Sequence, residues 1–247
     1  MDGSSTLPSS TEFKPLIFNG FLVAVFFVIF EQMIADEIRA KLQNIVRGEL
    51  QEGQMDSCTA IRNLLCKSFG TGPTVKSEFA GRTILKEKQV RFLKSYAEKG
   101  NLWLESLPAG SQYLTEGGES KVYLSEDGRS VIKVNDAGYY ATWAEYFNSL
   151  LLHNLLFPNT AYSLLGFTEF DQKLLAVIQQ PFVEGEQAAL EHIEEFLNFN
   201  GFRKIKRQDY YNKELGLALE DMHDENVIAR DNVLFFIDTV FYIMENK

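Results

Sequence analysis

The chain has 247 residues, of which 45% are hydrophobic and 23% charged, and its formal net charge is −10. A chain of this length and composition is expected to fold into one large globular domain or two small ones. Because nucleic-acid surfaces are normally basic, the negative charge argues against a nucleic-acid partner. The one basic run, RKIKR at 203–207, is interpreted as a solvated loop or edge strand, with a local nucleic-acid or lipid contact as the alternative.

The first hundred residues contain no recognisable chemical motif. Residues 1–14 are rich in Ser, Thr, Gly and Pro, which predicts a disordered leader. Residues 15–100 are predicted to be an α-helical segment that opens with an apolar stretch at 16–30. Fifteen helical residues span about 22 Å, short of a hydrocarbon core of about 30 Å. This stretch is therefore interpreted as a buried or partner-bound helix, and a short membrane anchor or a signal sequence remain alternatives.

Helical periodicity continues through the rest of this segment. Apolar residues at three- and four-residue spacing predict one helix from Phe30 to Val46, and two more at 59–68 and 86–98. Gly53 is expected to end the first helix and Gly100 to cap the third. The two cysteines, at 58 and 66, are about 12 Å apart along a helix, too far for a disulfide within it. No cysteine–histidine cluster is present, so zinc binding is not expected, and reduced thiols agree with a cytoplasmic location.

Residues 101–247 form the second predicted unit, with strands and helices in alternation. A strand that contains Val122 is separated from a second strand at 130–134 by an Asp-Gly turn, which predicts a β-hairpin. Gly117 and Gly118 precede the first strand, and glycines there allow the backbone to approach phosphates closely. On its own, this hairpin is more simply explained as an ordinary turn.

Lys133 lies in the middle of the second strand, among apolar neighbours. A buried lysine there needs a partner anion, such as a carboxylate or phosphate oxygens. A helix is predicted at 140–156 with Glu145 as its only carboxylate, which could reach back to Lys133 and position it for a phosphate. The alternatives are an exposed strand lysine and a surface glutamate. His153 of the same helix is interpreted as a packed or capping residue.

Two further strands are predicted at 164–167 and 174–180, followed by a linker at 180–185 and a helix at 188–198. The stretch 214–243 then places Asp221, Asn226 and Asp238 at intervals of five and twelve residues. A carboxylate, an amide and a carboxylate suit a base and two metal ligands around a phosphate, and oxygen ligands suit Mg²⁺. The alternative is that all three are ordinary turn residues between strands.

The order of these parts resembles the protein-kinase-like fold. More closely, residues 86–247 are similar to the polyvalent protein kinase domain of bacterial mobile-element proteins, especially from Bacteroides-type bacteria. The passages that resemble it are GGESKVYL, VIKVN, LLLHNLLFPNTAYSLLGF, QQPFVEGE, LEDMHDENV and FFID. The resemblance implies an α+β fold with a small antiparallel β lobe. Because nine residues follow Asp238, the second lobe is expected to be abbreviated.

The resemblance also implies roles for individual residues, with ATP and Mg²⁺ as cofactors. Those implied to bind the nucleotide are Gly117, Gly118, Val122 and Lys133, with Gln180 and Phe182 at the hinge that meets adenine. Glu145 would hold Lys133, Asp221 would be the catalytic base, and Asn226 and Asp238 would hold magnesium.

The sequence departs from the kinase pattern at three places. Ser120 replaces the third glycine, Leu219 and Glu220 stand where His-Arg is usual, and Asp238 is followed by Thr239-Val240, with no glycine. The expected function is an ATP- and Mg²⁺-dependent phosphotransferase that acts on a protein or small-molecule hydroxyl. The alternatives are a catalytically inactive nucleotide-binding or interaction module, and a membrane-tethered structural protein that uses residues 16–30.

Overall fold

The computed structural model describes residues 17–18, 21–22, 36–52, 56–70, 79–118 and 120–244. The leader expected at 1–14 and most of the apolar stretch at 16–30 lie outside these residues. Within that stretch, β1 (Ile17–Phe18) and β2 (Phe21–Leu22) pair antiparallel, so these four residues are extended and not helical as predicted. Among the described helices, none combines the length and apolar character that crossing a membrane requires.

Three helices make up the described N-terminal part, as their periodicity predicted: α2 (Asp36–Val46), α3 (Ser57–Phe69) and α4 (Phe79–Lys99). The Asp56 side chain begins α3 by accepting a 2.7 Å hydrogen bond from the Thr59 N–H. After α4 the left-handed residue is Asn101 (φ 55°) and not Gly100, because asparagine also tolerates this conformation. Arg62 of α3 is fully buried and donates to the backbone oxygens of Ile45, in the last turn of α2, and of Glu49, just after that helix.

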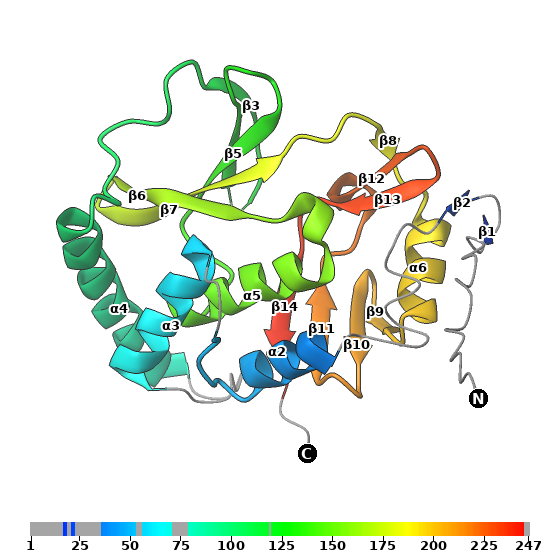
Figure 1. Ribbon diagram of the computed structural model, residues 1–247, viewed down its shortest axis with the longest axis horizontal. Coiled ribbons are helices and arrows are strands. Elements are labelled where there is room, and N and C mark those ends of the chain that lie inside the picture. Colours follow the sequence, from blue (N-terminus) through cyan, green and yellow to red (C-terminus); the bar gives the residue numbers. More distant parts are fainter. Residues whose placement is uncertain are drawn as a thin grey trace, which may run out of the picture.

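A five-stranded antiparallel sheet forms the upper layer of Figure 1. Its strands, in the order in which they pair, are β3 (Gln112–Glu116), β4 (Ser120–Leu124), β5 (Ser130–Asn135), β7 (Lys173–Pro181) and β6 (Ser163–Phe170). The β4–β5 hairpin turns at Gly128 (φ 67°), as the Asp-Gly pair predicted. In the central strand β5, Lys133 lies opposite Val122 of β4 and Ile178 of β7.

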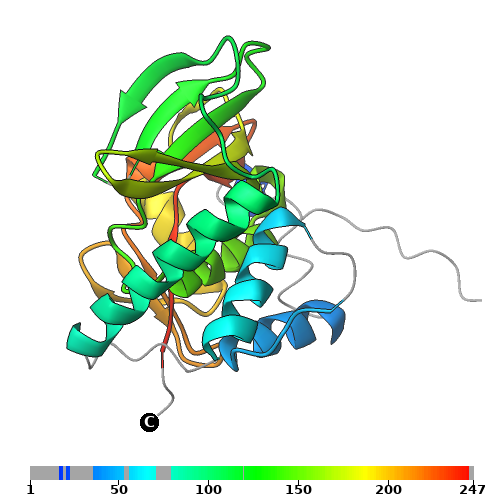
Figure 2. The ribbon, with the colours of Figure 1, turned by 90° about the vertical axis from the view of Figure 1, so that its left-hand side faces the viewer.

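Helix α5 (Trp143–Leu156) lies under this sheet (Figure 1), and most of its residues are buried. The rings of Trp143 and Phe147 lie 6.1 and 6.2 Å from that of Phe167 in β6, and all three are buried. Large aromatic contacts of this kind supply much of the apolar burial that holds a helix against a sheet. Helices α3 and α4 pack around α5, with α4 running across it in Figure 2.

The chain after β7 contains α6 (Leu190–Phe199) and two small antiparallel sheets. One comprises β14 (Val240–Ile243), β11 (Leu217–Glu220), β10 (Asp209–Asn212) and β9 (Arg203–Lys206), and the other β13 (Val233–Phe236), β12 (Val227–Arg230) and β8 (Glu186–Gln187). Because Glu220 lies opposite Val240, Asp221 and Asp238 leave the same end of the β11–β14 pair. The basic run is the exposed edge strand β9, one of its predicted alternatives, where Lys204 pairs with Glu194 at 2.6 Å.

Gly166 marks the closest approach between β6 and the segment before β3. A Cβ there would collide with the Leu102 carbonyl oxygen and lie 2.9 Å from Leu104 Cγ. The backbone cannot retreat freely, because Phe167 exchanges hydrogen bonds of 2.7 and 2.8 Å with Leu102 and Leu104. We expect Gly166→Ala to lower the free energy of unfolding by about 1–3 kcal/mol in urea titrations. Gly117→Ala, where an added Cβ meets open space, is the control, and equal losses in the two variants would contradict the packing argument.

Candidate active site

A cavity of about 820 Å³ lies between the five-stranded sheet and the segments that contain Asp221 and Asp238. Its volume is in the range of small-molecule sites. The structure brings nearly all the predicted site residues to this one cavity, and those that line it are Gly117, Gly118, Val122, Lys133, Gln180, Phe182, Asp221, Asn226 and Asp238. Glu145 is the member of the predicted set that lines a different cavity.

Lys133 crosses the cavity from the sheet to the segment around Asp238. Its side chain is only 8% exposed, and Nζ donates a 2.7 Å hydrogen bond to the Ile237 carbonyl oxygen. The same nitrogen lies 3.4 Å from Asp238 Oδ2 and 5.4 Å from the centre of the Tyr162 ring. A carbonyl, a carboxylate and an aromatic face together compensate for burying the ammonium group.

Glu145 lies at the start of α5, where it helps to cap the helix. Its backbone N–H donates to Thr142 Oγ1 at 3.2 Å, and its Oε2 accepts from the Ala141 N–H at 3.1 Å. The helix starts at Trp143 and not at Tyr140 as predicted, so Glu145 belongs to its first turn, where exposed N–H groups favour a carboxylate. The spacing Thr142–x–x–Glu145 is a capping-box signature and was the sequence signal for this role. The carboxylate that pairs with Lys133 is that of Asp238.

Asp221 follows β11 in a left-handed conformation (φ 64°), and its side chain is 66% exposed at the cavity. The backbone N–H of Asp221 donates to the Asp209 side chain at 3.2 Å, and the backbone carbonyl oxygen of Asp221 accepts from Asn226 Nδ2 at 2.8 Å. His223 Nε2 lies 3.4 Å from Asp221 Oδ1. Sequence reasoning missed His223 and Asp209, although both line the cavity. His223 could have been found from its place between Asp221 and Asn226, whereas Asp209 gave no local signal.

Asn226 and Asp238 meet because β12 and β13 form a tight hairpin. Val227 pairs with Phe236, so the Asn226 carbonyl oxygen accepts from the N–H groups of Ile237 at 3.0 Å and Asp238 at 3.4 Å. The hairpin register thus brings these two residues together at the cavity, although they are twelve residues apart in sequence.

The donor set suits Mg²⁺ only together with a phosphate ligand. Within the described ranges, no cluster of three His, Cys, Asp or Glu side chains could hold a metal ion by itself. Magnesium is commonly held by one or two carboxylates and the phosphate oxygens of a substrate. The Asp238 carboxylate and the Asn226 amide oxygen fit that pattern, since the Asn226 amide nitrogen already donates to Asp221.

A buried polar network behind the cavity holds the segment before and after Asp238. His153 of α5 is fully buried, with Nδ1 2.8 Å from Thr239 Oγ1 and Nε2 2.8 Å from the Thr160 carbonyl oxygen. Because a carbonyl only accepts, Nε2 carries the proton and Nδ1 accepts from the threonine hydroxyl. The buried Tyr162 hydroxyl donates to the Ile237 carbonyl oxygen at 2.9 Å. The interpretation of His153 as a packed residue agrees with its burial, and its contact with Thr239 fixes the residue after Asp238.

This network predicts a pH dependence of stability. Burial, together with the nearby positive charge of Lys133, lowers the pKa of His153 to about 3. Below about pH 6.5 the unfolded chain binds a proton at His153 that the folded protein does not. The free energy of unfolding is therefore expected to decrease as the pH is lowered below about 6.5. His153 alone contributes up to about 1.4 kcal/mol per pH unit to this decrease.

His153→Gln should reduce that slope in urea titrations between about pH 6.5 and pH 4.5. His192→Gln, a change on α6, is the control and should leave the slope unchanged. Equal slopes for His153→Gln and the unaltered chain would contradict the assignment.

Comparison with known proteins agrees with this geometry. A family model described as Serine/Threonine/Tyrosine Kinase found in polyvalent proteins matches residues 86–245. No curated protein matches the chain. The family match covers more than half of the sequence, so the chain belongs to this kinase family, as its resemblance suggested. Membership implies a phosphotransferase that uses ATP and a substrate, and the match includes part of α4, which the predicted boundary at 101 leaves out.

Proposed function

We propose that this member of the polyvalent-protein kinase family is an ATP- and Mg²⁺-dependent phosphotransferase that acts on a hydroxyl group of a protein or small molecule. The observation that supports it most is that Lys133, Asp221, Asn226 and Asp238 line one cavity together with the Gly117–Gly118 turn. We assign the activity to residues 101–247 with the adjoining half of α4. Because the chain resembles domains of bacterial mobile-element proteins, we also propose that it functions as part of such a protein.

The proposed roles follow from charge and position. Phosphoryl transfer requires positioning and neutralisation of negative charge more than covalent assistance. Lys133 supplies a buried cation at the sheet side, under the glycine turn that would cover the phosphates. Asp238 and Asn226 would hold Mg²⁺, which would neutralise negative charge on the phosphates. Asp221, exposed at the cavity and 3.4 Å from His223, would accept the proton of the attacking hydroxyl.

The adenine end of the cavity is expected at the strand–linker junction after β7. The Gln180 side chain is buried, and its Nε2 donates to the Thr160 carbonyl oxygen at 2.7 Å, so it closes the inner end. The Phe182 N–H is bonded to the Arg129 carbonyl oxygen at 2.9 Å. The backbone of Pro181 and Val183, with the Phe182 ring beside them, would then meet the base.

The second candidate is a nucleotide-binding module without turnover. Two observations favour it. Lys133 pairs with Asp238, so the lysine occupies the carboxylate that would hold magnesium. Glu145, the residue expected to hold Lys133, lines the other cavity. In an active state we expect nucleotide phosphates to replace Asp238 as the anionic partner of Lys133.

Two measurements on the full chain separate these candidates. Thermal unfolding with ATP, with and without Mg²⁺, tests binding, because a ligand that binds only the folded state raises the melting temperature. ADP release under saturating Mg·ATP then tests turnover. A Mg²⁺-dependent melting shift with ADP release supports the enzyme, and a shift without ADP release supports the binding module. Absence of any nucleotide-dependent shift contradicts both.

A further inference from the structure

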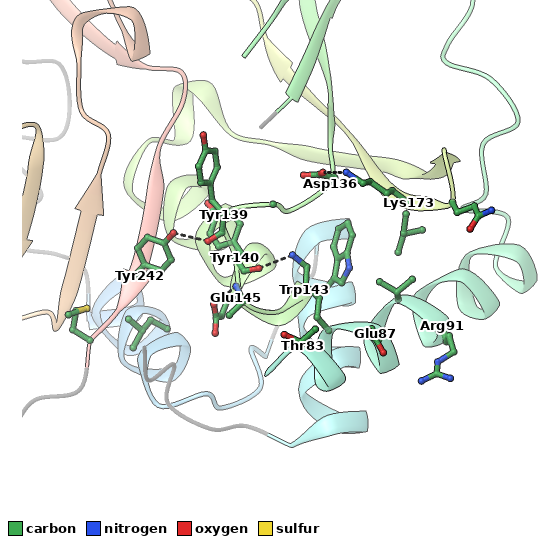
Figure 3. A pocket seen from close by; sticks show the side chains of 18 residues that line it. Thr83, Glu87, Arg91, Asp136, Tyr139, Tyr140, Trp143, Glu145, Lys173 and Tyr242 are labelled. Carbon is green, nitrogen blue, oxygen red and sulfur yellow. Dashed lines mark hydrogen bonds and ion pairs between the residues drawn. The ribbon is translucent and has the colours of Figure 1, made fainter. Parts of the chain in front are cut away.

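A second cavity of about 880 Å³ (Figure 3) shares Tyr139 and Tyr242 with the lining of the candidate nucleotide site. One side of α4, the 136–141 loop, the start of α5, the β6–β7 turn and the end of β14 surround it. Its size matches that of cavities that take small molecules. None of the proposed catalytic or magnesium-binding residues lines it.

The lining favours an uncharged aromatic ligand. The rings of Tyr139, Tyr140, Trp143 and Tyr242 and the side chains of Val90 and Leu174 contribute to its wall. Three basic and three acidic residues also line it, namely Lys86, Arg91 and Lys173 against Glu87, Asp136 and Glu145. Their charges balance, so the cavity does not require a charged group on its occupant.

Several of these charged groups already have partners within the wall. Lys86 Nζ donates to the carbonyl oxygens of Ala137 at 2.6 Å and Tyr140 at 2.8 Å. Lys173 Nζ lies 3.7 Å from Asp136 Oδ2, and both ends of this pair appear in Figure 3. The wall is therefore preformed, and the surface that it offers is mainly apolar.

Trp143 is a buried part of the cavity wall. Its side chain is 1% exposed and lines the cavity, yet its indole N–H has no hydrogen-bond partner in the described part of the chain. A buried donor without an acceptor costs free energy. The indole nitrogen is itself buried, so the part of Trp143 that contributes to the wall is the ring and not the donor.

The residues shared by the two cavities lie next to the glycine turn and the strand after Asp238, both of which belong to the proposed nucleotide site. Tyr139 and Tyr242 line both cavities, and the Tyr242 hydroxyl donates to the Tyr139 carbonyl oxygen at 3.1 Å. The Tyr139 hydroxyl lies against Gly118, where an added Cβ would be only 2.5 Å from it. Tyr242 belongs to β14, the strand that follows Asp238. A ligand that moves either tyrosine therefore acts on the glycine turn or on the strand after Asp238.

We propose that the second cavity is a binding site for an uncharged aromatic small molecule, and that its occupancy changes the affinity for Mg·ATP through Tyr139 and Tyr242. The coupling rests on the proposed function, whereas the binding does not. The two are measured separately.

Binding is tested with N-phenyl-1-naphthylamine, an uncharged aromatic fluorophore whose emission rises in apolar surroundings. Glu87→Trp fills the cavity from an exposed position on α4, and Lys88→Trp, also exposed but outside the lining, is the matched control. We expect saturable binding by the unaltered chain and by Lys88→Trp, with affinity at least about tenfold lower in Glu87→Trp. Val90→Glu, which places a charge on the apolar wall, should weaken binding similarly. Absence of saturable binding, or equal affinity in Glu87→Trp and Lys88→Trp, would overturn the site.

Coupling is tested by repeating the titration at saturating Mg·ATP. We expect the dissociation constant of the fluorophore to change by about fivefold or more, and Mg·ATP affinity to change by the same factor when the fluorophore is saturating. Unchanged constants would overturn the coupling and leave the binding result intact. A chain that binds the fluorophore but no Mg·ATP contradicts the proposed function and the coupling, and supports the ligand site alone.

Discussion

Asp221→Asn is expected to lower the rate of phosphoryl transfer by about 100- to 10,000-fold, while the affinity for Mg·ATP stays within about threefold of its original value. The amide has nearly the same shape as the carboxylate but cannot accept the proton of the attacking hydroxyl. Nucleotide binding is expected to be spared because Asp221 is exposed and its proposed contact is with the attacking hydroxyl and not with the nucleotide. ADP release measures the rate, and isothermal titration calorimetry measures the affinity.

The control for this variant is Asp231→Asn in the β12–β13 turn. Asp231 is also an aspartate in a left-handed conformation (φ 50°), and its side chain is 93% exposed and outside the cavity. The rate of phosphoryl transfer by the Asp231→Asn variant should equal that of the unaltered chain. A turnover rate that survives Asp221→Asn would exclude Asp221 as the base, and comparable losses in both variants would point to a general structural effect.

Lys133→Met is expected to weaken Mg·ATP binding by about 10- to 100-fold, because a charged hydrogen bond to phosphate oxygens contributes roughly 1.5–3 kcal/mol. Methionine preserves the length and apolar stem of the lysine, so β5 should keep its packing against Val122 and Ile178. In the unliganded protein the change also removes the contacts of Nζ with Ile237 and Asp238. Calorimetry with Mg·ATP measures the affinity, and circular dichroism confirms that the variant is folded.

Lys121→Met is the matched control because Lys121 lies on the neighbouring strand β4. It is exposed, and its Nζ lies 5.3 Å from the centre of the Phe170 ring, away from the cavity. Its affinity for Mg·ATP should be unchanged. If Lys133→Met binds Mg·ATP as tightly as Lys121→Met does, the nucleotide does not depend on the buried lysine.

The features that could be predicted from sequence are those fixed by local rules. The Asp-Gly turn determines the β4–β5 hairpin. Its register places Lys133 opposite Val122 of β4. The short interval between Asn226 and Asp238 is spanned by a single hairpin, so its register brings them together without help from distant residues. Such pairings depend on turn chemistry and strand alternation, which are visible in the sequence.

The features that could not be predicted depend on contacts between distant segments. The contact of His153 with Thr239 joins residues 86 positions apart, and the bond of Lys133 to Ile237 joins residues 104 apart. Glu145 is different, because its role was implied by the resemblance, whereas the helix starts three residues later than predicted and Glu145 caps its first turn. The second cavity combines four separate segments, so no stretch of sequence indicates it.

The central claim is that ATP occupies the cavity lined by Lys133, and covalent labelling tests it most directly. An adenosine derivative with a sulfonyl fluoride in place of the phosphates reacts with a lysine amine beside its binding site. Peptide mass spectrometry then identifies the labelled residue. We expect label on Lys133, with protection by Mg·ATP and loss in Lys133→Met. Label on other lysines only, or label on Lys133 that Mg·ATP does not reduce, would contradict the claim.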